Sequence, residues 1–355
     1  MLTPACWPTD QQELLLHACF APEEEARQAL DACRDQLDSP TLDPVTGRLL
    51  SLLYHRWGNR LSERAYLAHV GIWRSNQRRF LMALAIARDL QRDGVDCLFL
   101  KGVALTAAHY RDPALRGMED VDFLVRPQHV EGALQCLLRA GWIPEEGAGM
   151  AEILLRRRVR HAWQFHRGED ESCDLHWHPV VRCFSPSVAS LFWDGARTAE
   201  LLHRPILVPC PTDQLFHTCA HGLQWSWTPQ IRWVPDSLTV LREPAAIDWD
   251  RLQQLAAHAA MNLRLHFALE YLRRRFDAPV PVAVIEHLRA AGANERREYQ
   301  LLQKECPLGL ADRLWWHLTN FQRIRRFDDE WSRGWWGKGF TQYVALFGGS
   351  ENPLR

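Results

Sequence analysis

Hydrophobic and polar positions at the start of the chain repeat with the period of an α-helix. In the stretches DQQELLLHACF and EEEARQALDACRDQL, apolar side chains recur every three or four residues. The stretch SNQRRFLMALAIARDLQRDG shows the same pattern over a greater length, and Gly94 closes it as glycine closes many helices. The pattern therefore predicts an N-terminal helical region over residues 1–94.

The pattern changes at Val95, where short apolar runs replace the helical period. Four stretches are typical of strands, and all are bounded by polar or turn-forming residues: VDCLFL, VDFLV, HAWQFHR and CDLHWHP. Two stretches between them have helical spacing: VALTAAHY and QHVEGALQCLLRAGW. We expect a small mixed sheet with helices packed on it, over residues 95–205.

Helical spacing returns after about Pro211 and continues toward the end of the chain. It is clearest in TDQLFHTCAHGLQW, in IRWVPDSLTVLRE and in the long run WDRLQQLAAHAAMNLRLHFALEYLRRRF. No internal repeat and no low-complexity linker divides the chain. The expected fold is α+β, with a small mixed β-sheet core flanked by the N-terminal region and by a C-terminal helical region over residues 206–355.

Two aspartates stand in and beside the second predicted strand, in LRGMEDVDFLV. Because strand side chains alternate between faces, Asp120 and Asp122 emerge on one side, with Val121 and Phe123 on the other. Two like charges held this close repel, so they are tolerated only beside a cation or in water. If the strand that carries Asp174 lies next to this one, three carboxylates converge. Such a cluster would hold one or two magnesium ions and assist a displacement at phosphorus.

A turn between the first predicted strand and its helix supplies the opposite charge. In LFLKGVAL, free backbone N–H groups at the start of the helix would meet a phosphate, and Lys101 would add a positive charge. Gly102 would let the phosphate approach, and Arg116 follows before the aspartates. An ordinary structural turn is the alternative interpretation.

These residues resemble a known family. LFLKGVALTAAHYRDPALRGMEDVDFLV together with CDLHWHP is similar to the uncharacterised bacterial nucleotidyltransferases of the DNA polymerase beta-like superfamily, and the resemblance covers roughly residues 50–245. It implies that Lys101 and Gly102 form the phosphate turn and that Arg116 offsets phosphate charge. It also implies that the catalytic carboxylates and metal ligands are Asp120, Asp122 and Asp174. One departure is that superfamily members usually have Gly-Ser at this turn, whereas Lys101-Gly102-Val103 offers no hydroxyl.

The reaction implied by the resemblance transfers a nucleoside monophosphate from a nucleoside triphosphate, with ATP as the expected donor, and releases pyrophosphate. The acceptor would be a small molecule or a peptide, in a biosynthetic role. The implied cofactor is Mg²⁺, as two ions, with Mn²⁺ as a substitute. Two alternatives remain: a catalytically silent module that binds nucleotide for regulation, and a phosphotransferase that moves only the terminal phosphate.

Several histidines stand close to these residues in the sequence. His176 shares a strand face with Asp174, so it would orient that carboxylate, contact the acceptor or simply pack; a transition-metal site that includes His161, His166 and His178 is a weaker alternative. Four-residue spacing places Asp213, His217 and His221 on one stripe of a helix, which would bind the acceptor or form a polar seam. Arg232 and Asp236 would complete that wall, or form a local ion pair.

The charge balance bears on the partners. Lysine plus arginine (42) almost equals aspartate plus glutamate (43), so no overall field would attract nucleic acid or an anionic membrane. The N-terminal stretch lacks the basic start and apolar core of a secretory signal, and no apolar run approaches the ~20 residues that span a bilayer. We therefore expect a cytoplasmic protein with neither nucleic acid nor membrane as a partner.

Overall fold

The computed structural model of the chain describes residues 7–39, 42–223, 231–304 and 309–347. Helices make up its N-terminal part, and α5 is the longest of them. Their bounds are α1 Asp10–Phe20, α2 Glu23–Leu37, α3 Pro44–Gly47, α4 Leu50–Trp57 and α5 Glu63–Arg92. The helical periodicity of the sequence is therefore confirmed in this region.

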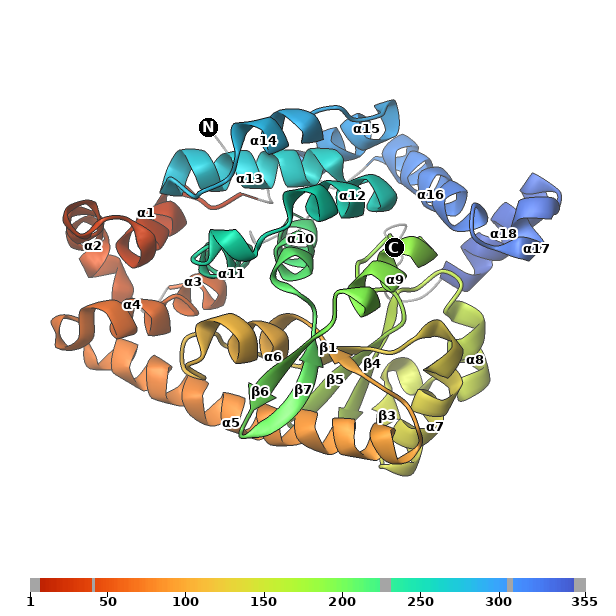
Figure 1. Cartoon of the computed structure of the whole chain (residues 1–355), viewed down its shortest axis with the longest axis horizontal. Helices are drawn as coiled ribbons and strands as arrows, with labels where there is room; N and C mark the ends of the chain where they lie inside the picture. The colour runs from red at the N-terminus through yellow and green to blue at the C-terminus, as the bar shows by residue number, and fades with distance from the viewer. Residues whose placement is uncertain (1–6, 40–41, 224–230, 305–308, 348–355) are drawn as a thin grey trace.

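A single sheet occupies the middle of the molecule, with α5 running along one side of it (Figure 1). Its strands are β1 Leu98–Phe99, β2 Val121–Leu124, β3 Ile143–Pro144, β4 Ala162–Arg167, β5 Glu171–His176, β6 Arg197–Leu201 and β7 Arg204–Val208. The spatial order is β3-β4-β5-β2-β1-β7-β6, with β2/β5 and β1/β7 parallel and the other pairs antiparallel. The expected α+β fold, a mixed sheet flanked by helices, is confirmed.

Helices connect and follow the strands. Within the sheet region they are α6 Lys101–Leu105, α7 Val130–Arg139, α8 Met150–Arg156 and α9 Pro186–Asp194. The C-terminal helices are α10 Pro211–Gly222, α11 Trp233–Val240, α12 Trp249–Ala259, α13 Asn262–Phe276, α14 Val282–Leu288, α15 Ala293–Leu302, α16 Leu310–Arg325, α17 Asp329–Arg333 and α18 Trp336–Phe347. None of the helices in the described part of the chain is both long and apolar enough to cross a membrane.

Two of these features differ from the sequence expectation. The run predicted as one long helix from Trp249 is broken, because Ala260 adopts a left-handed backbone conformation between α12 and α13. The hairpin β6–β7 and the short strand β3 were not predicted. Strand β7 also crosses residue 206, where the predicted C-terminal helical region begins. The division into three regions itself stays a prediction.

The two faces of the sheet pack against different helices. Phe99, Val121 and Phe123 belong to a core that includes side chains of α5 and α7. Leu98 and Leu124 belong to a second core, shared with the N-terminal helices and with α9 to α14. Since side chains alternate along a strand, Asp122 shares the face of Leu124, which is the face toward α10. Figure 1 shows α10 to α14 on the opposite side of the sheet from α5.

A buried ionic junction connects the C-terminal helices. Glu298 of α15 accepts hydrogen bonds from Arg182, which follows β5, from Arg264 of α13 and from Arg323 of α16. Nε and Nη2 of Arg182 and Nη1 of Arg323 are buried without a hydrogen-bond partner. We call these four residues the guanidinium cluster, and it has one negative charge for three positive charges.

Candidate active site

The parallel pairing of β2 with β5 builds the centre of the site. Asp122 lies directly opposite Asp174 in this register, and Leu124 lies opposite His176. Adjacent strands are about 4.8 Å apart, and alternate residues of β5 share a face. Asp122, Asp174 and His176 therefore project together, and each offers a potential metal-binding atom within 4.8 Å of the others. The expectation that the strand of Asp174 adjoins that of Asp122 is confirmed.

Asp122 is an ionised carboxylate held by two donors. Its Oδ1 lies 2.5 Å from Nζ of Lys101 and 3.0 Å from Nε2 of His176. Burial raises the pKa of Asp122, but the Lys101 charge and the His176 hydrogen bond outweigh it and hold the pKa below its usual range. Because this carboxylate can only accept, the proton of the His176 contact lies on Nε2, which leaves Nδ1 as a buried acceptor without a partner.

Asp174 is in the opposite electrostatic state. Its Oδ1 is buried and has no hydrogen-bond partner. Burial, followed by the charges of Asp122 and Asp120, raises the pKa of Asp174 to about 8. Near neutral pH this carboxyl group therefore keeps a proton unless a cation takes its place. The carboxylates of Asp122 and Asp174 and the imidazole of His176 form a set of ligands that fits a divalent metal ion, and the unpartnered oxygen of Asp174 is available to bind it.

Asp120 lies just before β2 and outside this close group. Burial and the charge of Asp122 raise the pKa of Asp120 to about 6, against the lowering effects of Lys101 and Arg232. Residues two apart on a strand are separated by roughly 6.6 Å, whereas residues paired across strands are closer. Spacing alone therefore does not separate Asp120 from His176; the close group contains His176, whose ring turns toward Asp122, and does not contain Asp120. The role of Asp120 as a metal ligand stays a prediction. We call Asp120, Asp122, Asp174 and Lys101 together the carboxylate cluster.

The turn that carries Lys101 has an unusual backbone. Lys101 has φ 43°, in the left-handed region that side-chain-bearing residues seldom adopt, and such strain is often found at functional sites. A Cβ on Gly102 would lie 2.3 Å from Cγ of Met118 and 2.8 Å from Nη1 of Arg116. The glycine is therefore required for packing against the segment before β2. Its predicted role in phosphate binding is a separate matter and stays a prediction.

Arg116 and Asp236 form a buried ion pair. Nε and Nη2 of Arg116 lie 2.8 and 2.9 Å from the two carboxylate oxygens of Asp236, and the hydroxyl of Tyr110 also donates to Asp236. Arg232, the other candidate partner of Asp236, instead donates to the carbonyl of Gly117 at 3.4 Å. Asp236 of α11 therefore fixes the position of Arg116, which was predicted to offset phosphate charge.

The two histidines of α10 differ in accessibility. His217 is buried, and its Nε2 lies 2.9 Å from the carbonyl oxygen of Pro179; burial, then the charges of Lys101 and His176, lower its pKa to about 3. His221, in the last turn of the same helix, is exposed. Asp213 of the same stripe pairs with Arg251 of α12, so that end of the stripe is a polar seam between helices.

His161 is a residue whose place beside the site the sequence did not establish. It precedes β4, and its ring lies 5.4 Å from the ring of His176, centroid to centroid. The sequence offered His161 only as part of a transition-metal alternative. His166, the other histidine of that strand, pairs with Ser172 in the hairpin register and is exposed.

Comparison with protein families identifies the class. A family model described as an uncharacterised nucleotidyltransferase matches residues 51–277, which is more than half of the 355 residues. The chain therefore belongs to this uncharacterised nucleotidyltransferase family. The match runs from α4 to just past α13 and includes every residue of the site described above. No curated protein matches the chain.

Proposed function

We propose that this protein is a metal-dependent nucleotidyltransferase that moves a nucleoside monophosphate from a nucleoside triphosphate, expected to be ATP, to a small-molecule or peptide acceptor. The observation that carries the proposal is the unpartnered, buried carboxylate oxygen of Asp174 beside the ionised Asp122. A buried carboxylate oxygen without a partner lowers the stability of the folded protein, and a bound cation would restore that stability. We also propose that the sheet region belongs to the DNA polymerase beta-like superfamily.

The metal site is proposed on Asp122 and Asp174, with either His176 or Asp120 as a further ligand. The divalent ion, Mg²⁺ or Mn²⁺, would neutralise phosphate charge and polarise phosphoryl oxygens. Lys101 and the backbone at Gly102 would hold the triphosphate of the donor. Asp236 neutralises the charge of Arg116, so Arg116 would contribute a hydrogen-bond donor at that turn: its Nη1 lies beside Gly102 and is not bonded to Asp236.

In the proposed reaction, an acceptor hydroxyl oxygen forms a bond to the α-phosphorus, and the bond from that phosphorus to the pyrophosphate oxygen breaks. The hydroxyl proton passes to the carboxylate of Asp174. Burial and the neighbouring aspartates raise the pKa of Asp174, and the charge of Lys101 lowers it. Lys101 therefore helps to keep Asp174 ionised, which is the form that can accept the proton. Pyrophosphate leaves with the electron pair of the broken bond.

Two of the five predicted acceptor-binding residues are accessible to such an acceptor. His221 is exposed, and the Arg232 side chain is 29% exposed, whereas His176, His217 and Asp236 are buried. We assign acceptor contact to His221 and Arg232, and positioning roles to the buried three. The balanced charge of the chain favours a free small molecule or peptide, in the cytoplasm, over a nucleic acid or a membrane.

The test is an assay of the full chain with each of the four labelled nucleoside triphosphates, Mg²⁺ and a panel of hydroxyl-bearing small molecules and peptides. Wild type should release pyrophosphate, and Asp122→Asn should reduce the rate at least 100-fold. The matched control is Asp170→Asn, since Asp170 is 85% exposed on the β4–β5 turn, and it should retain the rate.

Two other products would identify the alternatives. Release of a nucleoside diphosphate would make the protein a phosphotransferase. Nucleotide binding without turnover for any acceptor would support the silent regulatory module. Comparison of Asp120→Asn with His176→Gln for Mn²⁺ binding, by electron paramagnetic resonance, would show which of the two residues completes the metal site.

A further inference from the structure

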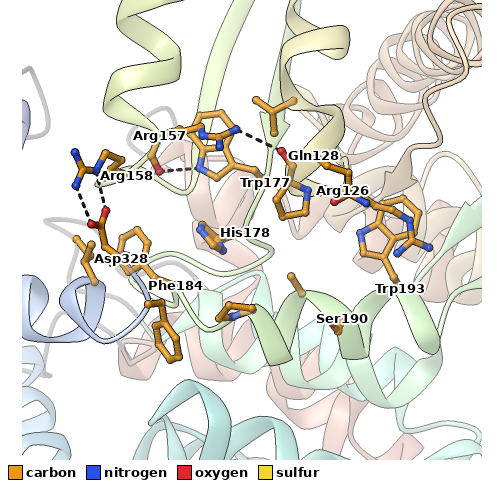
Figure 2. A pocket seen from close by; sticks show the side chains of 16 residues that line it. Arg126, Gln128, Arg157, Arg158, Trp177, His178, Phe184, Ser190, Trp193 and Asp328 are labelled. Carbon is orange, nitrogen blue, oxygen red and sulfur yellow. Dashed lines mark hydrogen bonds and ion pairs between the residues drawn. The ribbon is translucent and has the colours of Figure 1, made fainter. Parts of the chain in front are cut away.

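A recess lies beyond the ends of β2 and β5, where α9 faces the end of α16 and the residues before α17. Its volume is about 480 Å³, within the usual range for sites that bind small molecules. Figure 2 shows His178 pointing into the recess, with Trp177 and Arg157 along one wall and Arg126 beside Trp193 along another. All of its lining residues lie in the described part of the chain.

The recess has an excess of positive charge. Within the described residues, neither Arg126 nor Arg157 forms an ion pair with a carboxylate. The guanidinium of Arg126 lies 4.3 Å from the ring centroid of Trp193, and Nη1 of Arg157 donates to the carbonyl of Pro127 at 3.3 Å. Arg158 lines the same recess and is different, because Asp328 and Glu330 neutralise it. Two guanidinium groups are thus left for an anion.

Aromatic and aliphatic side chains form the remaining walls, and two of their buried polar atoms have no hydrogen-bond partner, Nδ1 of His178 and Nε1 of Trp193. The His178 ring packs edge-on against Phe184. Trp177 donates its indole N–H to the carbonyls of Arg157 and Arg160, so it presents only its ring. Guanidinium groups and aromatic faces together favour a flat organic anion over a simple inorganic ion.

The recess is continuous with the candidate active site along the chain. Trp177 and His178 follow His176 directly, and Arg126 comes two residues after the end of β2. Arg126 is four positions after Asp122 along extended chain, which is roughly 13 Å. An acceptor anchored in the recess and reaching back along the strands would span this distance.

We propose that this recess binds the end of the acceptor remote from the reacting hydroxyl, and that this end carries a carboxylate or phosphate on an aromatic or otherwise flat apolar body. The assignment as acceptor rests on the proposed nucleotidyltransferase function. The binding of such an anion is measurable without turnover. Arg126 and Arg157 pair with its charged group, and the exposed ring of Phe327, which also lines the recess, contacts its flat body.

The experiment titrates the full chain with 1-naphthyl phosphate, with 1-naphthoate and with neutral 1-naphthol, by calorimetry. We expect both anions to bind at least tenfold more tightly than naphthol, and their ratio distinguishes a phosphate from a carboxylate preference. The double variant Arg126→Gln/Arg157→Gln should lose at least tenfold in affinity for the preferred anion. Arg204→Gln, an exposed arginine of β7 outside the recess, should bind like wild type.

Three results would overturn the proposal: no binding of either anion, equal binding of naphthol, or full affinity in the double variant while its circular dichroism is unchanged. Competition by a non-hydrolysable ATP analogue would assign the recess to the nucleotide instead. If the anions bind through the two arginines and no acceptor yields pyrophosphate, the anion site stands and the transferase proposal fails.

Discussion

Two buried charge clusters in this molecule are unbalanced in opposite directions. The carboxylate cluster places one ammonium group among three carboxylates, and the guanidinium cluster places three guanidinium groups around one carboxylate. Both leave buried polar atoms without partners, among them Oδ1 of Asp174 and Nε of Arg182. The two clusters differ in whether a change of protonation can reduce their surplus charge.

A carboxyl group can take up a proton near neutral pH, and a guanidinium group cannot lose one. The pKa of Asp174 is raised to about 8, so its charge responds to protons and cations in the physiological range. Burial lowers the pKa of Arg182 only to about 10, so it stays charged. The carboxylate cluster is therefore suited to reversible binding, and the guanidinium cluster to a permanent connection between helices.

The largest effect should follow from removing the single carboxylate of the guanidinium cluster. Glu298→Gln leaves three buried guanidinium groups without a counter-charge, so we expect the free energy of unfolding to fall by about 3–5 kcal/mol. Urea denaturation followed by circular dichroism measures it. Glu286→Gln, at an exposed position of α14, is the control and should change stability by less than about 0.5 kcal/mol. A loss below about 1 kcal/mol for Glu298→Gln would mean that the cluster is not the connection described above.

Removing the single cation of the carboxylate cluster should cost less. Lys101→Met takes from Asp122 a charged hydrogen-bond partner, for an expected loss of about 2 kcal/mol at pH 7. Because the folded-state pKa of Asp122 is held low, this stabilisation exists above the ordinary pKa and disappears as pH falls through the folded value. The difference between Lys101→Met and wild type should therefore shrink in acid. If Lys101→Met and wild type were equally stable at pH 7, Lys101 would not be the group that stabilises the ionised Asp122.

Asp174→Asn should stabilise the protein without added metal, and only at higher pH. The raised pKa means that folding is favoured while Asp174 keeps its proton, and that this contribution is lost as pH rises from about 4 to about 8. An amide imitates the protonated form, so we expect a gain of about 1–2 kcal/mol at pH 8 and almost none at pH 5. Asp170→Asn is the exposed control. A pH-independent difference between Asp174→Asn and wild type would show that Asp174 titrates normally.

The smallest predicted effect concerns the metal ion itself. Below pH 8 a divalent ion must displace the proton of Asp174, so Mn²⁺ affinity should rise up to tenfold, about 1.4 kcal/mol, from pH 6 to pH 7. Electron paramagnetic resonance of free Mn²⁺ measures the affinity. Wild type with a flat pH profile would exclude Asp174 as a ligand that exchanges a proton for the ion.

The sequence was sufficient for those parts of the fold that depend on local periodicity. The strands around Asp122 and Asp174 and the helix that became α5 follow from spacing alone. The break at Ala260 could not be predicted because no glycine or proline signals it. The strand β7 was missed because Pro205 near its start is typical of a turn or a sheet edge.

At the site, alternation placed the carboxylates on one face but could not set their distances. Whether Asp120 or His176 lies closer to Asp174 depends on the register between β2 and β5, which pairs residues about fifty positions apart in the chain. The partner of Asp236 is likewise non-local, since Arg116 is 120 residues away and Arg232 was the nearer candidate. Sequence spacing thus identifies chemical groups, and tertiary pairing decides which of them meet.

The parallel contact of β1 with β7 limits whether the sheet region can be separated from the helices that follow it. Leu98 pairs with Leu207, and Arg116 depends on Asp236 of α11. A fragment that stopped at residue 205 would leave the edge of β1 without its partner strand. It would also leave the buried guanidinium of Arg116 without the carboxylate of Asp236. We therefore expect that the shortest fragment able to fold with the site intact extends through α11, so the sheet and these helices form one folding unit.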